Sequence, residues 1–169
     1  MNGLSSYDPD FKRPQLIDEV VSDYKQEGKY LDHSAVGNTL YIAIKASGYS
    51  VILVYLMYGP ARGESCGWMY RVLDETMAPV VDNCPEKLLK LSTCKAPEAV
   101  AWRQRCRDKR KQNNEKHRYL RSLKPGDKVK YGGSEITFRW VSSRKFFVAR
   151  NGEGQIYKYR VVGVDLPEA

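Results

Sequence analysis

The stretch TLYIAIKASGYSVILVYLMY, residues 39–58, decides the fold of the first half of the chain. Leu40, Ile42 and Ile44 recur at every second position, which is the period of a β-strand. Ser47-Gly48 supplies a turn, and residues 51–58 then form a nearly continuous apolar run, typical of a central strand covered on both faces. The pattern predicts two neighbouring strands at the heart of a sheet.

A helix and a third strand flank this stretch. After an irregular leader over residues 1–13, Pro14 can begin a helix, because the first helical turn does not use the missing N–H. Apolar residues recur at helical spacing up to Gly28, a typical C-terminal stop, and residues 68–72 alternate as a strand. Residues 1–96 are therefore predicted to form an α+β module, a small antiparallel sheet with helices on one face.

Two further helices are predicted to begin at prolines. Pro85 begins a short leucine-containing helix, and Pro97 begins a longer one. The longer helix places Ala99, Trp102 and Cys106 on one face, which we expect to dock on the first module.

Beyond that face the longer helix changes character. Residues 107–118, RDKRKQNNEKHR, contain no aliphatic or aromatic hydrocarbon side chain. A helix there can bury nothing substantial, so it is solvated or held by a partner. We assign residues 97–121 to a basic helix or linker.

The last part of the chain, residues 122–169, is all-β in pattern. Turn signals at residues 123–127, Gly132-Gly133, Ser142-Ser143 and Asn151-Gly152 separate short alternating runs. Four or five strands spaced this closely predict a small SH3-like barrel.

Basic charge is concentrated in the second half of the chain. Residues 1–96 hold 10 Lys+Arg against 12 Asp+Glu, a net charge of −2, and residues 97–169 hold 18 against 8, a net charge of +10. Together they give the net charge of +8 for the whole chain. This asymmetry indicates a localised contact with a polyanion, with simple solubility as the alternative.

Composition excludes several classes of protein. Hydrophobic residues make up 42% of the chain, enough for a packed core, and no apolar run is long enough to span a bilayer. The N-terminus has no signal-peptide pattern, so we expect a cytoplasmic protein with no membrane contact. The cysteines, Cys66, Cys84, Cys94 and Cys106, lack the paired spacing of zinc sites and are predicted to be reduced and mostly buried.

Four short motifs occur in one order along the chain. They are Asp74-Glu75-Thr76-Met77-Ala78-Pro79, Cys84-Pro85, Trp102-Arg103-x-Arg105-Cys106 and Leu123-Lys124-Pro125-Gly126-Asp127. In these motifs, over residues 31–131, the chain resembles an uncharacterised family found in phages, plasmids and other mobile elements of bacteria. The resemblance implies a genomic context, and with it a bacterial host cell, rather than a mechanism. Small phage accessory proteins are often inhibitors of host defence systems, including CRISPR nucleases.

Cations and aromatic residues of the second half are the candidate site. Nine cations within residues 103–121 do not share one helical stripe, which suits contact with phosphates better than reading of bases. In the tail, cations alternate with aromatics; we expect Phe138, Trp140 and Phe146 in the core and Tyr157 and Tyr159 at the surface. The predicted nucleic-acid or partner-binding residues are Arg103, Arg105, Arg107, Lys109, Arg110, Lys111, Lys116, Arg118, Arg121, Lys128, Lys130, Arg144, Lys145, Tyr157 and Lys158.

The sequence favours a binding protein over an enzyme. Asp74-Glu75 with His33 and Cys84 could form an acid–base or metal site, yet adjacent carboxylates diverge on a strand and also serve as helix caps. We therefore expect no catalytic residue, no metal and no cofactor. The prediction is an accessory protein that binds nucleic acid or a nucleoprotein and inhibits a host defence nuclease, as an anti-CRISPR does; a metal-dependent hydrolase and a protein–protein adaptor are the alternatives.

Overall fold

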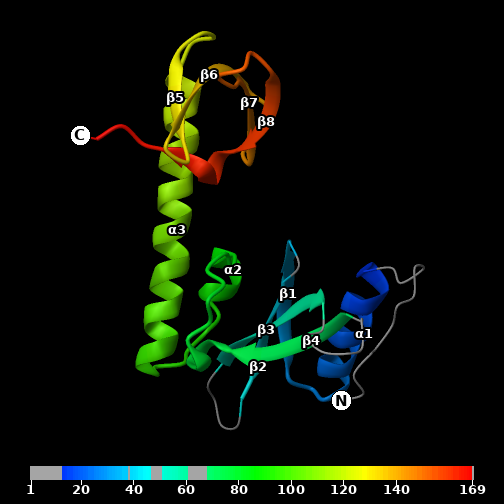
Figure 1. The fold of residues 1–169 in the computed structure, drawn as a ribbon. Coiled ribbons are helices and arrows are strands. Elements are labelled where there is room, and N and C mark those ends of the chain that lie inside the picture. Colours follow the sequence, from blue (N-terminus) through cyan, green and yellow to red (C-terminus); the bar gives the residue numbers. More distant parts are fainter. Residues whose placement is uncertain (1–12, 38, 47–50, 61–67, 169) are drawn as a thin grey trace. The chain divides into compact units, whose positions relative to one another are not determined.

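The structure of the chain, a computed structural model, describes residues 13–37, 39–46, 51–60 and 68–168 (Figure 1). The expected leader, apart from Arg13, and the Ser47-Gly48 turn lie outside these residues. In chain order the elements are α1 (Arg13–Gln26), β1 (Tyr30–Val36), β2 (Thr39–Lys45), β3 (Val51–Pro60), β4 (Trp68–Asp74), η1 (Glu75–Met77), α2 (Glu86–Leu89), α3 (Pro97–Ser122), β5 (Lys128–Tyr131), β6 (Ser134–Val141), β7 (Phe146–Arg150), β8 (Ile156–Arg160), η2 (Val161–Gly163) and β9 (Val164–Asp165).

The chain divides into two compact units, residues 1–107 and 108–169. Each unit contains one antiparallel sheet, so the protein is α+β with two antiparallel sheets and helices. The division falls inside α3, whereas the sequence places its boundaries at residues 96 and 121. In the part of the chain that the structure describes, no helix combines the length and apolarity needed to cross a membrane.

The sheet of the first unit has the strand order β1-β2-β3-β4. The apolar strand β3 is an inner strand, as its sequence predicts. The edge strand β1 was not predicted, because its sequence YLDHSAV mixes polar and apolar residues without strict alternation. It pairs with β2 through a tight connection, in which Val36 lies opposite Thr39.

Helices cover both faces of this sheet, and the expectation of helices on one face is wrong. On one face Leu40, Ile42 and Ile44 of β2 pack against apolar residues of α1. On the other face Tyr41 and Ala43 pack against residues of α2 and α3, among them the predicted docking residues Trp102 and Cys106. The physical reason is that β2 is buried on both faces, from Thr39 to Ile44, so each face needs its own cover. Cys84 and Cys106 are buried thiols of this core, Cys94 is half-buried, and Cys66 lies outside the described residues.

The ends of several elements follow directly from their residues. Gly28 has a φ of +67° and ends α1, with the Lys29 N–H donating to the Tyr24 carbonyl. In the second unit, Gly132 and Gly133 have φ of +55° and +82°, the backbone that a two-residue hairpin between β5 and β6 requires.

The sheet of the second unit has the order β8-β7-β6-β5-β9. The last strand, β9, follows the short helix η2 and pairs with β5, the first strand. No pairing joins β8 to β9 among the described residues, so the sheet is open between them.

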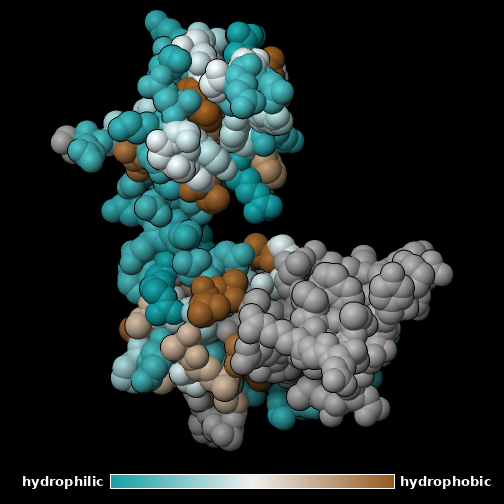
Figure 2. Space-filling model, viewed as in Figure 1, coloured by the Kyte–Doolittle hydropathy of each residue, from teal (hydrophilic) through white to brown (hydrophobic). Residues whose placement is uncertain are grey.

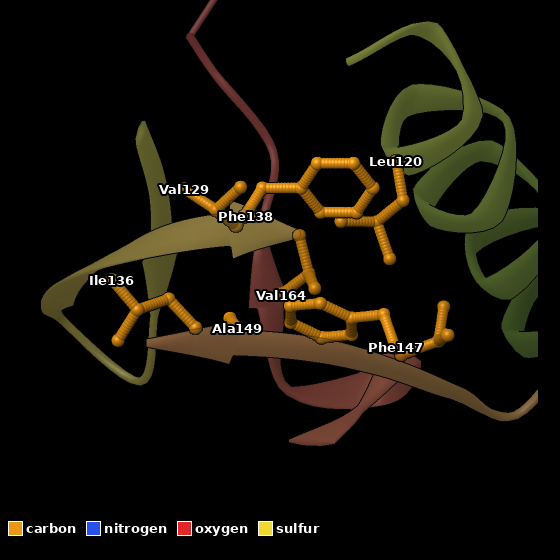
Figure 3. Close-up of a cluster of buried hydrophobic side chains, with 8 residues drawn as sticks. Leu120, Val129, Ile136, Phe138, Phe147, Ala149 and Val164 are labelled. Atoms are coloured by element: carbon orange, nitrogen blue, oxygen red, sulfur yellow. The ribbon is translucent and has the colours of Figure 1, made fainter. Parts of the chain in front are cut away.

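The core of the second unit lies on one face of this sheet (Figure 3). Leu120 near the end of α3 points toward Phe138 of β6 and Phe147 of β7, and all three are buried. Val129 of β5 and Val164 of β9 belong to the same cluster, with Ile136, Ala149 and Val161. The end of α3 therefore belongs to the fold of the second unit, because it covers the apolar face of that sheet.

Candidate nucleic-acid interface

The first arginine of the basic helix is an internal residue. Arg103 is buried, and its guanidinium forms an ion pair with the buried carboxylate of Glu75. The same guanidinium donates to Ser92 Oγ at 2.7 Å and to the Cys94 carbonyl at 2.6 Å. Ser92 Oγ in turn donates to Glu75 Oε1 at 2.6 Å. Arg103 thus fastens α3 to the 3-10 turn that follows β4, and its donors are directed into the protein.

Three further cations of the helix also have partners within their own unit. Arg105 Nη2 donates to the Pro79 carbonyl at 2.8 Å, and Arg107 Nε lies 3.2 Å from Glu86 Oε1. In the second unit Lys116 Nζ donates to the Val162 carbonyl at 2.7 Å. The side chains of Arg107 and Glu86 are still partly exposed, so this pair contributes little to stability.

A second group of helix cations faces solvent. Lys111, Arg118 and Arg121 are exposed, and no hydrogen bond or ion pair holds their side chains among the described residues. At 100° per residue, Lys111 and Arg118 lie on the side of α3 opposite the buried Leu120. Lys109 is exposed and Arg110 is half-buried. Lys111 and Arg118 thus share one side of the helix that the core of the second unit does not use, and the exposed Arg121 lies beside that side.

The pKa of His117 is affected by burial and by two arginines. Its imidazole has a pKa below the ordinary value, first because of burial and then because Arg121 and Arg144 lie nearby. Arg144 belongs to the turn between β6 and β7, beside the exposed Lys145. Arg121 on α3 and Arg144 on this turn therefore both act on His117 and disfavour its protonated form, an effect that a bound anion would offset.

The other predicted residues of the tail lie on the strands of the second sheet. Lys128 is exposed and paired with Glu135 at 3.3 Å, and Lys130 is exposed on the same strand. Tyr157 is 48% exposed, as predicted, whereas Tyr159 packs against the core and burial raises its pKa. Lys158 lies between these tyrosines in sequence and so faces the opposite side of the sheet.

A β-bulge decides which aromatic residues of β6 reach the surface. Phe138 pairs with Ala149, but Trp140 pairs with Val148, so Arg139 is an extra residue on β6. Before the bulge Phe138 points into the core, and after it Val141 takes the inward position. Trp140 is 53% exposed, and its predicted place in the core is wrong, because the bulge shifts the alternation by one residue.

The outward face of this sheet holds residues that the predicted site omitted. Trp140 and Val148, neither of them in the predicted site, lie opposite each other on β6 and β7, and Lys158, which was predicted, lies opposite Val148 on β8. Lys158 Nζ lies 4.8 Å from the ring centroid of Phe146, a cation–π contact. Phe146 is half-buried rather than in the core, and Arg150 and Arg160 share its face through their pairings. Alternation in β7 and β8 could have identified these residues; the bulge that adds Trp140 has no sequence signal.

The alternative site at Asp74 and Glu75 has structural partners. Asp74 Oδ1 accepts a hydrogen bond from the Thr76 N–H at 2.7 Å and so caps η1, and Glu75 is held by Arg103. His33 Nδ1 lies 2.9 Å from the Tyr30 hydroxyl, while Cys84 is buried in the core. Within the described ranges, no three His, Cys, Asp or Glu side chains gather as a metal site would require.

Net charge differs sharply between the two units. Residues 1–107 hold 13 Lys+Arg and 13 Asp+Glu, a net charge of zero, and residues 108–169 hold 15 against 7, a net charge of +8. The whole excess of positive charge therefore belongs to the second unit. Figure 2 shows hydrophilic residues over much of the visible face of this unit, with hydrophobic residues between them.

Comparison with known proteins adds no relative. The chain matches no protein-family model, and no curated protein or solved structure is significantly similar to it.

Proposed function

We propose that this chain binds nucleic acid, free or in a nucleoprotein, through its second unit. The observation that carries the proposal is that the entire net charge of +8 belongs to residues 108–169. Exposed cations in this number attract a polyanion and release its counterions on binding. Since Lys111, Arg118 and Arg121 form no hydrogen bond or ion pair with the residues that the structure describes, contact with phosphates breaks no such pair there.

The proposed contacts differ from the predicted residues in a definite way. We leave Arg103 out, because removing its guanidinium from Glu75 would strand a buried carboxylate. Arg105, Arg107, Lys116 and Lys128 would have to exchange an internal partner for a phosphate, so they are secondary. Tyr157 faces the other side of the sheet from Lys158. The principal contacts that we propose are Lys111, Arg118, Arg121, Lys130, Arg144, Lys145 and Lys158.

We further propose that the second unit is an SH3-like barrel. Supporting this, the fifth strand follows a single 3-10 turn and pairs with the first, giving the order β8-β7-β6-β5-β9. A small barrel offers a rigid scaffold, so its surface cations would keep their spacing when a ligand binds.

The biological role that we propose is that of a phage or mobile-element accessory protein. It would act by occupancy in the cytoplasm of the bacterial host, covering a nucleic acid or a guide-loaded or DNA-bound defence nuclease, as an anti-CRISPR does. The resemblance in the four motifs supports the genomic setting. Competition for a phosphate surface needs affinity and no chemistry, and Asp74 and Glu75 already have structural partners, which disfavours the metal-dependent hydrolase.

Salt dependence tests the binding proposal. Fluorescence anisotropy of labelled oligonucleotides, with the full chain, should show affinity falling linearly with salt on a log–log plot between about 50 and 200 mM. A contact with five phosphates of a single strand would give a slope of about −3.5. An affinity independent of salt, or no binding at all, would reject the proposal and leave the protein–protein adaptor.

The proposed biological role is tested separately. The full chain is used to capture its partners from a bacterial lysate, with and without nuclease treatment. Recovery of a defence nuclease supports the inhibitor role, and recovery of nucleic acid alone, lost after treatment, restricts the proposal to nucleic-acid binding.

A further inference from the structure

We infer that the outward face of the second sheet is a platform on which unpaired bases of single-stranded nucleic acid stack. The inference deepens the proposed function and rests on it. Its residues are Trp140, Phe146, Val148 and Lys158, which we call the outer platform.

The exposure of Trp140 is the first argument. The bulge at Arg139 turns the indole away from the core while Val141 fills the inward position, so the core does not use Trp140. An indole that is 53% exposed leaves a large apolar surface in water, which is costly unless a partner covers it. Strict alternation from Phe138 would turn Trp140 into the core, and the extra residue Arg139 reverses that orientation.

The neighbours of Trp140 complete a surface suited to flat rings. Val148 lies directly opposite Trp140, and Phe146 is two residues from Val148 on β7, which makes it the diagonal neighbour of Trp140. Diagonal pairs are separated by roughly 7–8 Å, within the reach of aromatic side chains. Trp140 is therefore the exposed ring that can receive a base, and Phe146, with Lys158 over its ring, lies on its diagonal.

Charge around the outer platform is positive. Lys158 Nζ lies over the Phe146 ring, and Arg150 and Arg160 lie on the same face of β7 and β8. Neither strand contains an acidic residue: their sequences are FFVAR and IYKYR. A strand whose bases stack on the rings would find cations for its phosphates on the same surface.

The combination selects single strands over duplexes. In a double helix the base planes are stacked on one another and only edges and phosphates face outward, so the outer platform would have nothing to stack. Unpaired strands expose base planes, and stacking is indifferent to sequence because every base has such a plane. The occupant is therefore an unpaired strand, recognised through features that DNA and RNA share.

Two variants of the full chain test the inference. Trp140→Ala removes the aromatic ring from the outer platform. Tyr157→Ala is the matched control, because Tyr157 is an aromatic residue of similar exposure, 48%, whose pairing with Ala149 puts it on the opposite face of the same sheet. Each variant is titrated against oligo(dT), oligo(U) and a duplex of equal length, and its thermal unfolding is compared with that of the unchanged chain.

We expect Trp140→Ala to weaken single-strand binding by roughly 5- to 150-fold, the effect of losing one base–aromatic stack. Tyr157→Ala should stay within about twofold, and Trp140→Phe should retain most of the affinity because it keeps a ring. Quenching of tryptophan fluorescence by the oligonucleotide in the unchanged chain, absent in Trp140→Phe, gives a readout that survives if Trp140→Ala fails to fold.

Equal affinities of Trp140→Ala and Tyr157→Ala for single strands, in a chain that binds them, would overturn the outer platform and leave the proposed function intact. Binding of the duplex as tight as that of the single strand would also overturn it. If the unchanged chain binds no nucleic acid, the proposed function fails and the inference fails with it.

Discussion

The two ends of α3 use the same residue type in opposite ways. Between residues 103 and 107, arginines are directed to carboxylates and carbonyls of the first unit. Further along the helix, Lys111, Arg118 and Arg121 face solvent and form no hydrogen bond or ion pair within the described part of the chain. The difference teaches that a run of positive charge is not one functional feature, because the local supply of acceptors decides whether a cation stabilises the fold or remains available to a ligand.

The largest predicted difference between the two ends of α3 is in their contribution to the free energy of unfolding. Arg103→Met should lower the free energy of unfolding by about 3–5 kcal/mol, because it leaves the carboxylate of Glu75 buried without its cation. Urea denaturation followed by circular dichroism measures the loss. Arg118→Met is the control on the same helix and should change stability by less than about 0.5 kcal/mol.

Similar stabilities for Arg103→Met and Arg118→Met would break the distinction between the two ends. If the loss does come from the stranded carboxylate, the double variant Arg103→Met, Glu75→Leu should recover a large part of it, because no buried charge remains.

The next largest predicted effect is on the affinity for nucleic acid. Changing Lys111, Arg118 and Arg121 to Gln should weaken nucleic-acid binding on the order of 100-fold at about 0.1 M salt and reduce the salt slope by about 2 units, since three phosphate contacts are lost. Anisotropy titrations at several salt concentrations measure both quantities.

The matched control removes the same number of exposed charges from the first unit, with Lys45, Lys90 and Lys95 changed to Gln. An equal loss of affinity in this control would show that only net charge matters and that Lys111, Arg118 and Arg121 have no special part in binding.

The smallest effect concerns pH. Burial, followed by Arg121 and Arg144, lowers the pKa of His117, so the folded protein holds this imidazole neutral where the unfolded chain would protonate it. Stability contributed by the neutral form is complete above the unfolded pKa of about 6.5 and is lost as the pH falls through the lowered pKa of the folded state. His117→Gln should flatten this part of the stability–pH profile.

A bound polyanion should raise the pKa of His117 by countering the two arginines, and NMR titration of its ring protons with and without oligonucleotide would detect the change. Proton uptake follows, so affinity should rise modestly as the pH falls from about 7 to about 6. An unmoved titration would place the ligand away from the cluster of His117, Arg121 and Arg144.

Much of the fold could be predicted because its signals are local. The alternation around Ile42, the stop at Gly28 and the paired glycines at Gly132-Gly133 each determine their element through backbone or packing physics within a few residues. Strand β1 was missed because Asp32 and His33 interrupt its apolar pattern; its pairing depends on β2, which lies further along the chain.

The candidate site was less predictable, because its decisive contacts are long-range. Nothing near Arg103 indicates that Glu75, 28 residues earlier, would take its charge. The outward orientation of Trp140 depends on a register shift between β6 and β7, and no residue of β6 indicates that shift in the sequence. Sequence gives the number of cations and aromatics, and the pairing of distant segments decides which of them reach the surface.

The bulge takes Arg139 out of the alternation and leaves the pairing of its neighbours intact. Phe138 and Trp140 lie opposite Ala149 and Val148, which are consecutive on β7, so a strand without Arg139 would still turn Phe138 inward, Trp140 outward and Val141 inward. Deletion of this one codon should therefore remove the bulge and keep the exposed indole. The outer platform thus tolerates a strand that is one residue shorter at this point.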